Sequence, residues 1–299
     1  MTTGYNATNL EFRRLSLLTM LFIEPSEEEI ASVCKLKESL LLETTSPHAR
    51  DVSDVKVLRF LRGRNHIHDK TLHGLVKHCE WREQYKVDEI LHSTDSFLTE
   101  LNTRKIANVG LDLKSRPIIC LFARRHNKDM RDINEIQSCI IHCLETAMTR
   151  VNAKDEKILI VFDLAQFALS CMDYEVVKML VNILQFNYPE ILSAALIVNS
   201  PLIFSACWQI IRLMLDPVTA AKCVFIKPSQ LCEYIHPDDI PEDIQGVIRT
   251  EGNRPENESK IEIDPEIVSE RLATHEEKEE NGADLDCNGE SSASNIKTA

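Results

Sequence analysis

The sequence predicts an α/β fold in which a helical N-terminal subdomain is followed by a mostly parallel sheet covered by helices. Residues 25–95 show the apolar spacing of amphipathic helices. Between residues 100 and 246, short apolar runs alternate with helical segments, a pattern typical of βαβ units and parallel sheets. From residue 247 onward the chain is acidic and has no aromatic residue. These three observations divide the chain into a helical part, an α/β part and a polar tail.

The helical part follows an extension over residues 1–24 whose structure the sequence does not define. Ser26 and Glu29 have the spacing of a capping box, which predicts a helix from there to about Leu42. Two further helices are expected over 53–64 and 69–85, the second with Asp69 as its N-cap. Together these elements predict a small helical subdomain over residues 25–95.

The α/β part contains four apolar runs that we interpret as strands, at 118–123, 158–163, 194–198 and 223–226. Helices are expected over 133–151 and 174–186, between the first three of these strands. We therefore place the α/β domain at residues 100–246. The tail over 247–299 has too few large apolar residues to bury a core, so we expect it to be disordered.

Residues 202–215 predict a helix that is apolar around most of its circumference. Ser205, Gln209 and Arg212 lie about one turn apart and form one narrow polar stripe. Such a helix must be buried on several sides or face an apolar ligand. It is therefore either a core helix or a lid over a lipid cavity, and the periodicity alone favours the core helix.

Composition excludes several classes of protein. The net charge of −13 argues against nucleic acid as a partner, because that affinity depends on Lys and Arg neutralising phosphates. The ten cysteines are scattered without a CxxC pair, so neither a disulfide framework nor a zinc site is expected. No run is long enough to span a membrane. Common enzyme motifs are absent, and we expect no metal, no cofactor and no catalytic activity.

An ordered series of motifs carries a family resemblance over residues 50–246. The series is VKVLRFLRGR, HCEWREQY, RPIICLF, KILIVFDL, NYPEILSAALIVNSPLIFSACWQIIRLMLDPVTAAKCVFI and LCEYIHPDDIPEDIQG. It resembles the CRAL-TRIO lipid-binding family and, within it, the yeast-type phosphatidylinositol transfer proteins. The resemblance implies one apolar lipid cavity closed by a mobile helix. That lid would present Leu202, Phe204, Trp208, Ile211 and Leu215.

The resemblance also implies a site for an inositol phosphate headgroup. Arg64 occupies the end of the RFLRxR motif, Glu190 the YPE motif, and Thr219 and Lys222 the DPVTxxK motif. Arg64 and Lys222 can neutralise a phosphate, Thr219 can donate a hydrogen bond, and Glu190 can accept from inositol hydroxyls or orient Lys222. Taken singly, each residue also fits an ordinary solvated helix end or surface turn.

One departure from the relatives concerns a second lipid. Ile158 and Ile160 occupy the strand positions where the relatives have Ser and Thr for a choline headgroup. These apolar side chains argue against phosphatidylcholine binding by that route.

The resemblance implies a lipid-binding and transfer protein rather than an enzyme. We expect a cytoplasmic monomer, peripherally associated with membranes, that holds a phospholipid and exchanges it during transient contact with a membrane surface. Phosphatidylinositol is the expected ligand. Two alternatives stay open: a non-transferring interaction module for small GTPases or signalling partners, and a carrier of a sterol, retinoid or tocopherol. A protein partner also remains open.

Overall fold

The computed structural model describes residues 24–151 and 156–244, all of which belong to one compact unit. The expectations for the extension over residues 1–23 and for the tail from residue 245 onward lie outside the described residues. The proposed boundary between the helical subdomain and the α/β domain stays a prediction.

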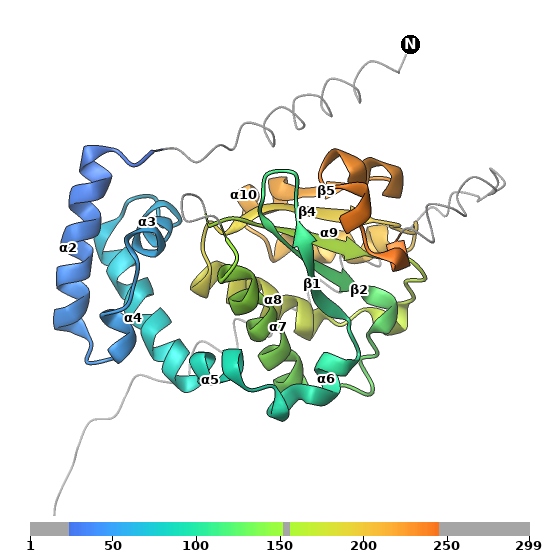
Figure 1. The fold of residues 1–299 in the computed structure, drawn as a ribbon, viewed down its shortest axis with the longest axis horizontal. Coiled ribbons are helices and arrows are strands. Elements are labelled where there is room, and N and C mark those ends of the chain that lie inside the picture. Colours follow the sequence, from blue (N-terminus) through green and yellow to red (C-terminus); the bar gives the residue numbers. More distant parts are fainter. Residues whose placement is uncertain (1–23, 152–155, 245–299) are drawn as a thin grey trace, which may run out of the picture. The chain divides into compact units, whose positions relative to one another are not determined.

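The helical subdomain contains four α-helices (Figure 1), namely α2 (Glu27–Glu43), α3 (Asp54–Arg62), α4 (His68–Gln84) and α5 (Val87–His92). The predicted capping box at the start of α2 is confirmed. The Glu29 amide donates to Ser26 Oγ at 3.2 Å, and the Ser26 amide donates to Glu29 Oε2 at 3.1 Å. Apolar side chains of α2, α3 and α4 pack into one core, in which Leu36, Phe60 and Leu75 are fully buried.

The start of α4 differs from the prediction. Its N-cap is Ile67 rather than Asp69, and no side chain caps the helix. Asn65 and His66 both take the left-handed conformation, with φ of 53° and 61°. These two residues complete the turn after α3, so the helix starts two residues earlier than the capping pattern indicates.

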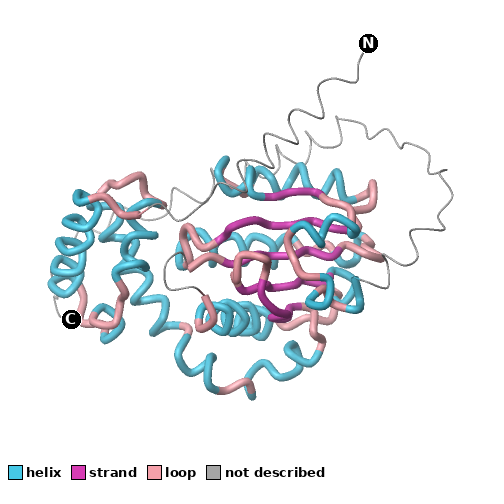
Figure 2. The backbone as a smooth tube through the Cα atoms, turned by 45° about the horizontal axis from the view of Figure 1, so that its top comes forward, coloured by secondary structure: helices cyan, strands magenta, loops and turns pink. Residues whose placement is uncertain are grey.

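Five strands form one sheet in the order β1-β2-β3-β4-β5 (Figure 2). They are β1 (Ile106–Leu111), β2 (Pro117–Phe122), β3 (Ile158–Asp163), β4 (Leu192–Val198) and β5 (Cys223–Phe225). The first pair is antiparallel and the other three are parallel. The predicted fold class is therefore confirmed. Four strands match the predicted runs, whereas β1 was not predicted, because its sequence IANVGL is only half-buried and weakly apolar.

Two helices, α7 (Ile133–Met148) and α8 (Tyr174–Asn187), cover one face of the sheet. The strand register aligns Ile119, Ile160, Ala195 and Cys223 in a row across that face. The opposite face, with Leu159 and Leu196 at its centre, is covered by the segment over residues 228–244.

The remaining helices are connecting elements. They are α6 (Leu98–Asn102), α9 (Phe204–Leu213), α10 (Pro217–Lys222) and single 3₁₀ segments at Pro47–Ala49, Asp95–Phe97, Ala123–Arg125, Leu169–Cys171, Pro228–Glu233 and Pro237–Asp239. Both α9 and α10 lie in the connection from β4 to β5. Among the helices that the structure describes, none is long and apolar enough to cross a membrane.

Candidate functional site

A cavity of about 210 Å³ lies between the sheet, α8 and α9. The sheet contributes Ile160, Phe162, Ala195 and Ile197 to its wall. One face of α8 closes the second side, with Val176, Val177, Leu180, Val181 and Leu184. Apart from Lys105, His126, Asp173 and Thr219, the lining consists of apolar residues and cysteines. Such a cavity suits the hydrocarbon part of a ligand.

The third side of the cavity is the helix that the sequence marked as unusually apolar. Phe204, Trp208 and Ile211 of α9 line the cavity, as does Leu215 just beyond its end. Leu202 lies before the helix, is 54% exposed and is not part of the wall. The polar residues Ser205, Gln209 and Arg212 lie on the solvent side of the helix. On that side Leu213 is also 66% exposed. The helix is therefore only half-buried and carries apolar groups on both sides.

A cluster of charged residues lies where the loop before β4 meets α10. Lys222 is buried, and its Nζ lies 3.5 Å from Glu190 Oε2. Lys157, which immediately precedes β3, lies 3.5 Å from the same oxygen and donates a hydrogen bond to the backbone carbonyl of Glu190. Burial and the neighbouring Lys222 lower the pKa of Lys157 to about 8. Two lysines therefore converge on one carboxylate and provide positive charge for an anionic group.

The short helix α10 connects this cluster to the cavity. Asp216 caps it by accepting from the amides of Val218 and Thr219, both at 2.9 Å, and Pro217 occupies its first turn. Thr219 lies in the cavity wall, and its Oγ1 donates to Asp216 Oδ2 at 2.6 Å. Lys222 follows three residues later, so both side chains lie on one face of the helix. Thr219 therefore links the cavity wall to the short helix that carries Lys222.

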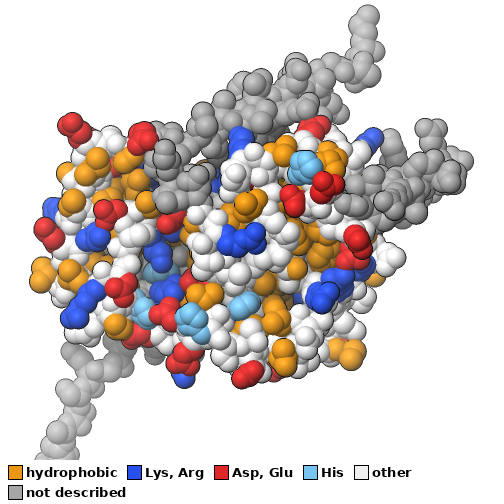
Figure 3. All heavy atoms as spheres, viewed as in Figure 1, with side chains coloured by type: hydrophobic (Ala, Val, Ile, Leu, Met, Phe, Trp, Pro, Cys, Tyr) orange, Lys and Arg blue, Asp and Glu red, His pale blue; other side chains and the backbone are white. Residues whose placement is uncertain are grey.

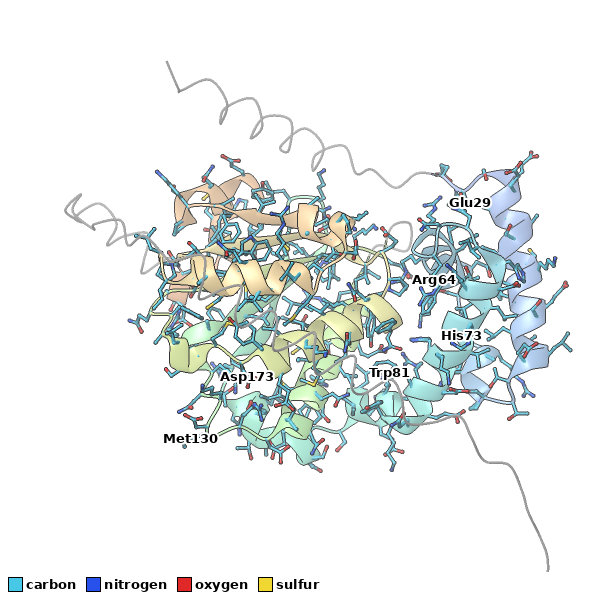
Figure 4. All side chains as sticks on the ribbon, turned by 180° about the vertical axis from the view of Figure 1, so that it is seen from behind. Glu29, Arg64, His73, Trp81, Met130 and Asp173 are labelled. Carbon is cyan, nitrogen blue, oxygen red and sulfur yellow. The ribbon has the colours of Figure 1, made fainter. Side chains whose placement is uncertain are left out.

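Arg64, the fourth residue implied by the resemblance, projects from the helical subdomain just after α3 (Figure 4). Its guanidinium carbon lies 4.7 Å from the centre of the Phe60 ring. A Cβ at Gly74 would lie 2.4 Å from Arg64 Nε, so only glycine lets the guanidinium lie against α4. Among the described residues, no hydrogen bond or ion pair joins Arg64 to Glu190, Thr219 or Lys222. The structure therefore brings three of the four residues together and leaves Arg64 apart.

The α3 helix nevertheless reaches the segment that holds Glu190. A Cβ built at Gly63 would lie 3.0 Å from Pro189 Cβ and 3.9 Å from Glu190 Cγ. Gly63, the residue that caps the end of α3, therefore lies against this segment. Burial lowers the pKa of Arg64, although it remains a permanent cation.

A polar network fixes the residues immediately before Pro189. Tyr188 Oη donates to Glu145 Oε1 at 2.5 Å, and Arg82 binds both oxygens of Glu145 at 2.9 and 3.1 Å. The Tyr188 ring also meets Trp81 edge to face at 5.9 Å. One residue earlier, Asn187 Oδ1 lies 3.3 Å from His78 Nδ1. The helical subdomain therefore holds the segment that presents Glu190.

A second polar group closes the other end of the cavity, beyond the carboxyl ends of the parallel strands. Lys105 Nζ donates to Glu100 Oε1 at 2.7 Å and lies 3.3 Å from His126 Nδ1. His126 Nε2 lies 3.2 Å from Asp173 Oδ2, which also pairs with Arg131. Burial lowers the pKa of His126, so the ring is neutral near pH 7 and donates from Nε2. Lys105, His126 and Asp173 thus form a connected polar group in the cavity wall, whereas Glu100 Oε2 is buried without a hydrogen-bond partner among the described residues.

Sequence reasoning missed several of these residues. Lys157 could have been found from topology, because it directly precedes a buried strand and therefore lies at the same sheet edge as the start of β4. Arg59 lies among the apolar residues Val57, Leu58, Phe60 and Leu61, and a charge within an apolar helix face signals a buried ion pair. Lys105, His126 and Asp173, at the other end of the cavity, come from separate segments of the chain, and no sequence motif connects them.

Residues 101–246 match the family described as the CRAL/TRIO domain. The resemblance inferred from the ordered motifs is therefore confirmed. The matched span contains all five strands, the cavity-forming helices α8 and α9, and the residues Glu190, Thr219 and Lys222. Arg64 lies before it.

Two curated fungal relatives illustrate the similarity. A CRAL-TRIO domain-containing protein of Schizosaccharomyces pombe is 30% identical over 204 residues, which cover 66% of this chain and 46% of the relative. The phosphatidylinositol transfer protein CSR1 of Eremothecium gossypii is 29% identical over 207 residues, which cover 66% of this chain and 48% of the relative. The matched region thus spans about half the length of each relative.

The fold of the described chain also resembles a solved structure. The crystal structure of Sfh5 matches with a TM-score of 0.61, covering 86% of this chain and 99% of that chain. The two sequences are 14% identical, so the likeness concerns the fold alone.

Proposed function

We propose that this chain binds one phospholipid, phosphatidylinositol, with its acyl chains in the cavity and its headgroup at the Glu190–Lys222 cluster. The observation that supports this most is the position of Thr219 in the cavity wall, three residues before buried Lys222. An apolar cavity joined to a cationic cluster matches the two halves of an anionic amphiphile. The relative CSR1 is named as a phosphatidylinositol transfer protein, which agrees with this ligand class.

Different parts of the protein bind the acyl chains and the headgroup. Burying acyl chains contributes about 0.8 kcal/mol per CH₂. Lys222 neutralises the phosphate, Thr219 donates to it once released from Asp216, and Glu190 accepts from inositol hydroxyls. Arg64 becomes a further phosphate ligand only if its side chain moves from α4 toward this cluster. Each of these steps is binding rather than covalent chemistry, so the chain acts as a carrier and not as an enzyme.

The helix α9 is the lid in this proposal. Trp208 and Ile211 contact the apolar chains, whereas Leu213 and Leu202 face outward and can enter a membrane surface. Opening the lid in water exposes apolar area, but at a membrane lipid replaces that water. Membrane contact therefore favours exchange, and the protein works at the cytoplasmic surface of membranes.

Native mass spectrometry of the full chain purified from a eukaryotic host tests the ligand. Extraction and identification of the released lipid should give phosphatidylinositol bound one to one, without phosphatidylcholine, because Ile160 lines the cavity where a choline site would need hydroxyls. A neutral sterol or isoprenoid would contradict the headgroup assignment and favour a carrier of small hydrophobic molecules. An empty protein that also fails to load from vesicles would contradict lipid carriage altogether.

A further inference from the structure

Arg59 of α3 is a buried cation whose hydrogen-bonding capacity is mostly unused. The residue is 5% exposed, and Nη2 pairs with Glu156 Oε2 at 2.8 Å. Its Nε and Nη1 are buried and have no hydrogen-bond partner among the described residues. Burial lowers the pKa of Arg59, yet a guanidinium stays charged in proteins. Buried donors without partners are rare, because their desolvation is not compensated, so these two require an explanation.

The Arg59–Glu156 pair adjoins the Glu190 cluster through two parts of the chain. Glu156 immediately precedes Lys157, which contacts both the carboxylate and the backbone carbonyl of Glu190. On the other side, Gly63, one turn after Arg59, packs against Pro189. Arg59 is also close enough to Lys157 to lower its pKa. The two ion clusters therefore form one continuous charged region beside the proposed headgroup site.

Positive charge exceeds negative charge in this region. Arg59, Lys56, Lys157 and Lys222 contribute four cations, whereas Glu156 and Glu190 contribute two carboxylates. The other charged groups nearby largely compensate one another, since Arg82 is paired with Glu145 and Asp88, and Arg62 with Glu29. A phosphodiester carries one negative charge, so phosphatidylinositol leaves about one of the two surplus charges unbalanced.

A phosphate monoester supplies the missing charge and acceptors, since it carries about −1.5 to −2 charges and three acceptor oxygens. We infer that Arg59 and Lys157 form a second phosphate subsite, selecting an inositol ring that bears a phosphate monoester besides its phosphodiester. This inference rests on the proposed function, because the inositol ring must already lie between Lys222 and Glu190. The two free donors of Arg59 then bind phosphate oxygens, and Lys157 moves from the Glu190 carbonyl to the monoester.

The experiment compares uptake of two lipids by the full chain. The protein is incubated with vesicles of phosphatidylcholine containing either phosphatidylinositol or phosphatidylinositol 4-phosphate, and the loaded fraction is measured by native mass spectrometry. We expect the monophosphate to bind about tenfold more tightly or better, as two charge-assisted hydrogen bonds provide. Equal or weaker binding of the monophosphate, with phosphatidylinositol still loaded, would overturn the second subsite and leave the proposed function standing. Failure to load either lipid would overturn both.

Two variants test whether Arg59 and Lys157 cause the preference for the monophosphate lipid. Lys157→Gln should reduce the ratio of the two affinities to near one, and Arg59→Lys, which keeps the charge but removes the unused donors, should reduce it about threefold or more. Lys178→Gln, an exposed lysine on α8, serves as the matched control and should leave the ratio unchanged. If Arg59→Lys fails to fold, Lys157→Gln alone decides, because its side chain is partly exposed. An unchanged ratio in Lys157→Gln would contradict the inference.

A further experiment distinguishes binding of the lipid from binding of its free, water-soluble headgroup. Inositol 1,4-bisphosphate presents the same two phosphates without acyl chains, and its binding is measured by calorimetry. We expect binding at least about a hundredfold weaker than that of the lipid, because the cavity stays unused. Binding as tight as that of the lipid would overturn the lipid as the natural source of the phosphates.

Discussion

At the scale of single residues, the position of Glu190 depends on its cationic neighbours. Its φ of 59° is a left-handed conformation that a non-glycine residue adopts only when its surroundings hold it. Lys157 binds its carbonyl, and Lys222 faces its carboxylate. One glutamate therefore orients both lysines, and its strained backbone keeps the carboxylate between them.

The titration of Lys157 gives a measurable pH dependence. Its pKa in the folded chain is about 8, against an ordinary value of 10.5, so above pH 8 the unfolded state binds more protons. This group therefore makes the protein more stable as the pH rises from about 8 to 10.5. Between pH 7.5 and 9.5, the free energy of unfolding of lipid-free wild type should increase by about 1–2 kcal/mol relative to Lys157→Met. Denaturant unfolding at both pH values measures this difference, and Lys178→Met should not differ from wild type.

Glu29 provides a second test at the residue scale. It completes the cap of α2, binds Arg62 at 2.8 and 2.9 Å, and lies 2.8 Å from His66. The hydrogen bond from Arg62 lowers the pKa of Glu29 to about 2, so its stabilisation is complete above pH 4.5 and is lost as the pH falls toward 2. At pH 7, Glu29→Gln should cost about 1–3 kcal/mol, and the difference from wild type should shrink in that acidic range. Glu28→Gln, an exposed neighbour, should cost less than about 0.5 kcal/mol; an equal loss in both variants would contradict this assignment.

At the scale of elements, the two sides of α9 make separable predictions. Leu213 faces solvent, so Leu213→Gln should leave stability within about 0.5 kcal/mol of wild type. It should nevertheless slow lipid transfer between vesicles several-fold, because less apolar area enters the membrane. Leu42→Gln changes an even more exposed leucine on α2, at 89% exposed, and should leave the transfer rate unchanged. Equal rates for Leu213→Gln and wild type would show that this side of α9 does not contact the membrane.

The elements also show what the sequence could and could not reveal. Buried strands and capped helices were predictable, because their apolar runs and the Ser26–Glu29 pair are local signals. The strand β1 was missed, since Asn108 and Gly110 are weak strand formers and interrupt its short apolar run. The helix α10 was not predicted, although proline in the first turn after an Asp cap is a local signal for the start of a helix.

The sequence likewise revealed only part of the candidate site. The resemblance selected Glu190, Thr219 and Lys222, which the structure places beside one another and the cavity. Lys157 and Arg59 carried no motif of their own, because their relation to Glu190 depends on sheet topology and on packing between α3 and the segment before β4. Long-range contacts of this kind are not visible in a single sequence.

At the scale of the whole molecule, the helical subdomain and the α/β domain are joined by a buried polar network. Arg82 and Glu145 are both 11% exposed at their side chains, and Tyr188 completes the network. Arg82→Met should destabilise the protein by about 2–4 kcal/mol, because Glu145 would stay buried without its cation. Lys86→Met breaks only an exposed pair with Glu89 and should cost less than about 0.5 kcal/mol. Denaturant unfolding measures the free energy of unfolding of both variants. Equal losses of stability in Arg82→Met and Lys86→Met would show that the buried network does not contribute to stability.

The face of the molecule shown in Figure 3 gives little long-range guidance for an anionic ligand. On the face shown in Figure 3, lysine and arginine side chains are interspersed with acidic ones, and hydrophobic side chains lie between them. Such a mixed surface produces only weak steering of charged partners. Under the proposed function, we therefore expect headgroup selection to depend on the buried cluster around Glu190.

Transfer of phosphatidylinositol between vesicles by wild type and Lys222→Ala tests the central claim most directly. Lys222 is buried against Glu190, so its removal should reduce the transfer rate at least about tenfold, while transfer by Lys178→Ala should equal that of wild type. Circular dichroism of the three proteins verifies that the variants are folded. If Lys222→Ala is folded and transfers phosphatidylinositol as fast as wild type, the headgroup does not bind at the Glu190–Lys222 cluster.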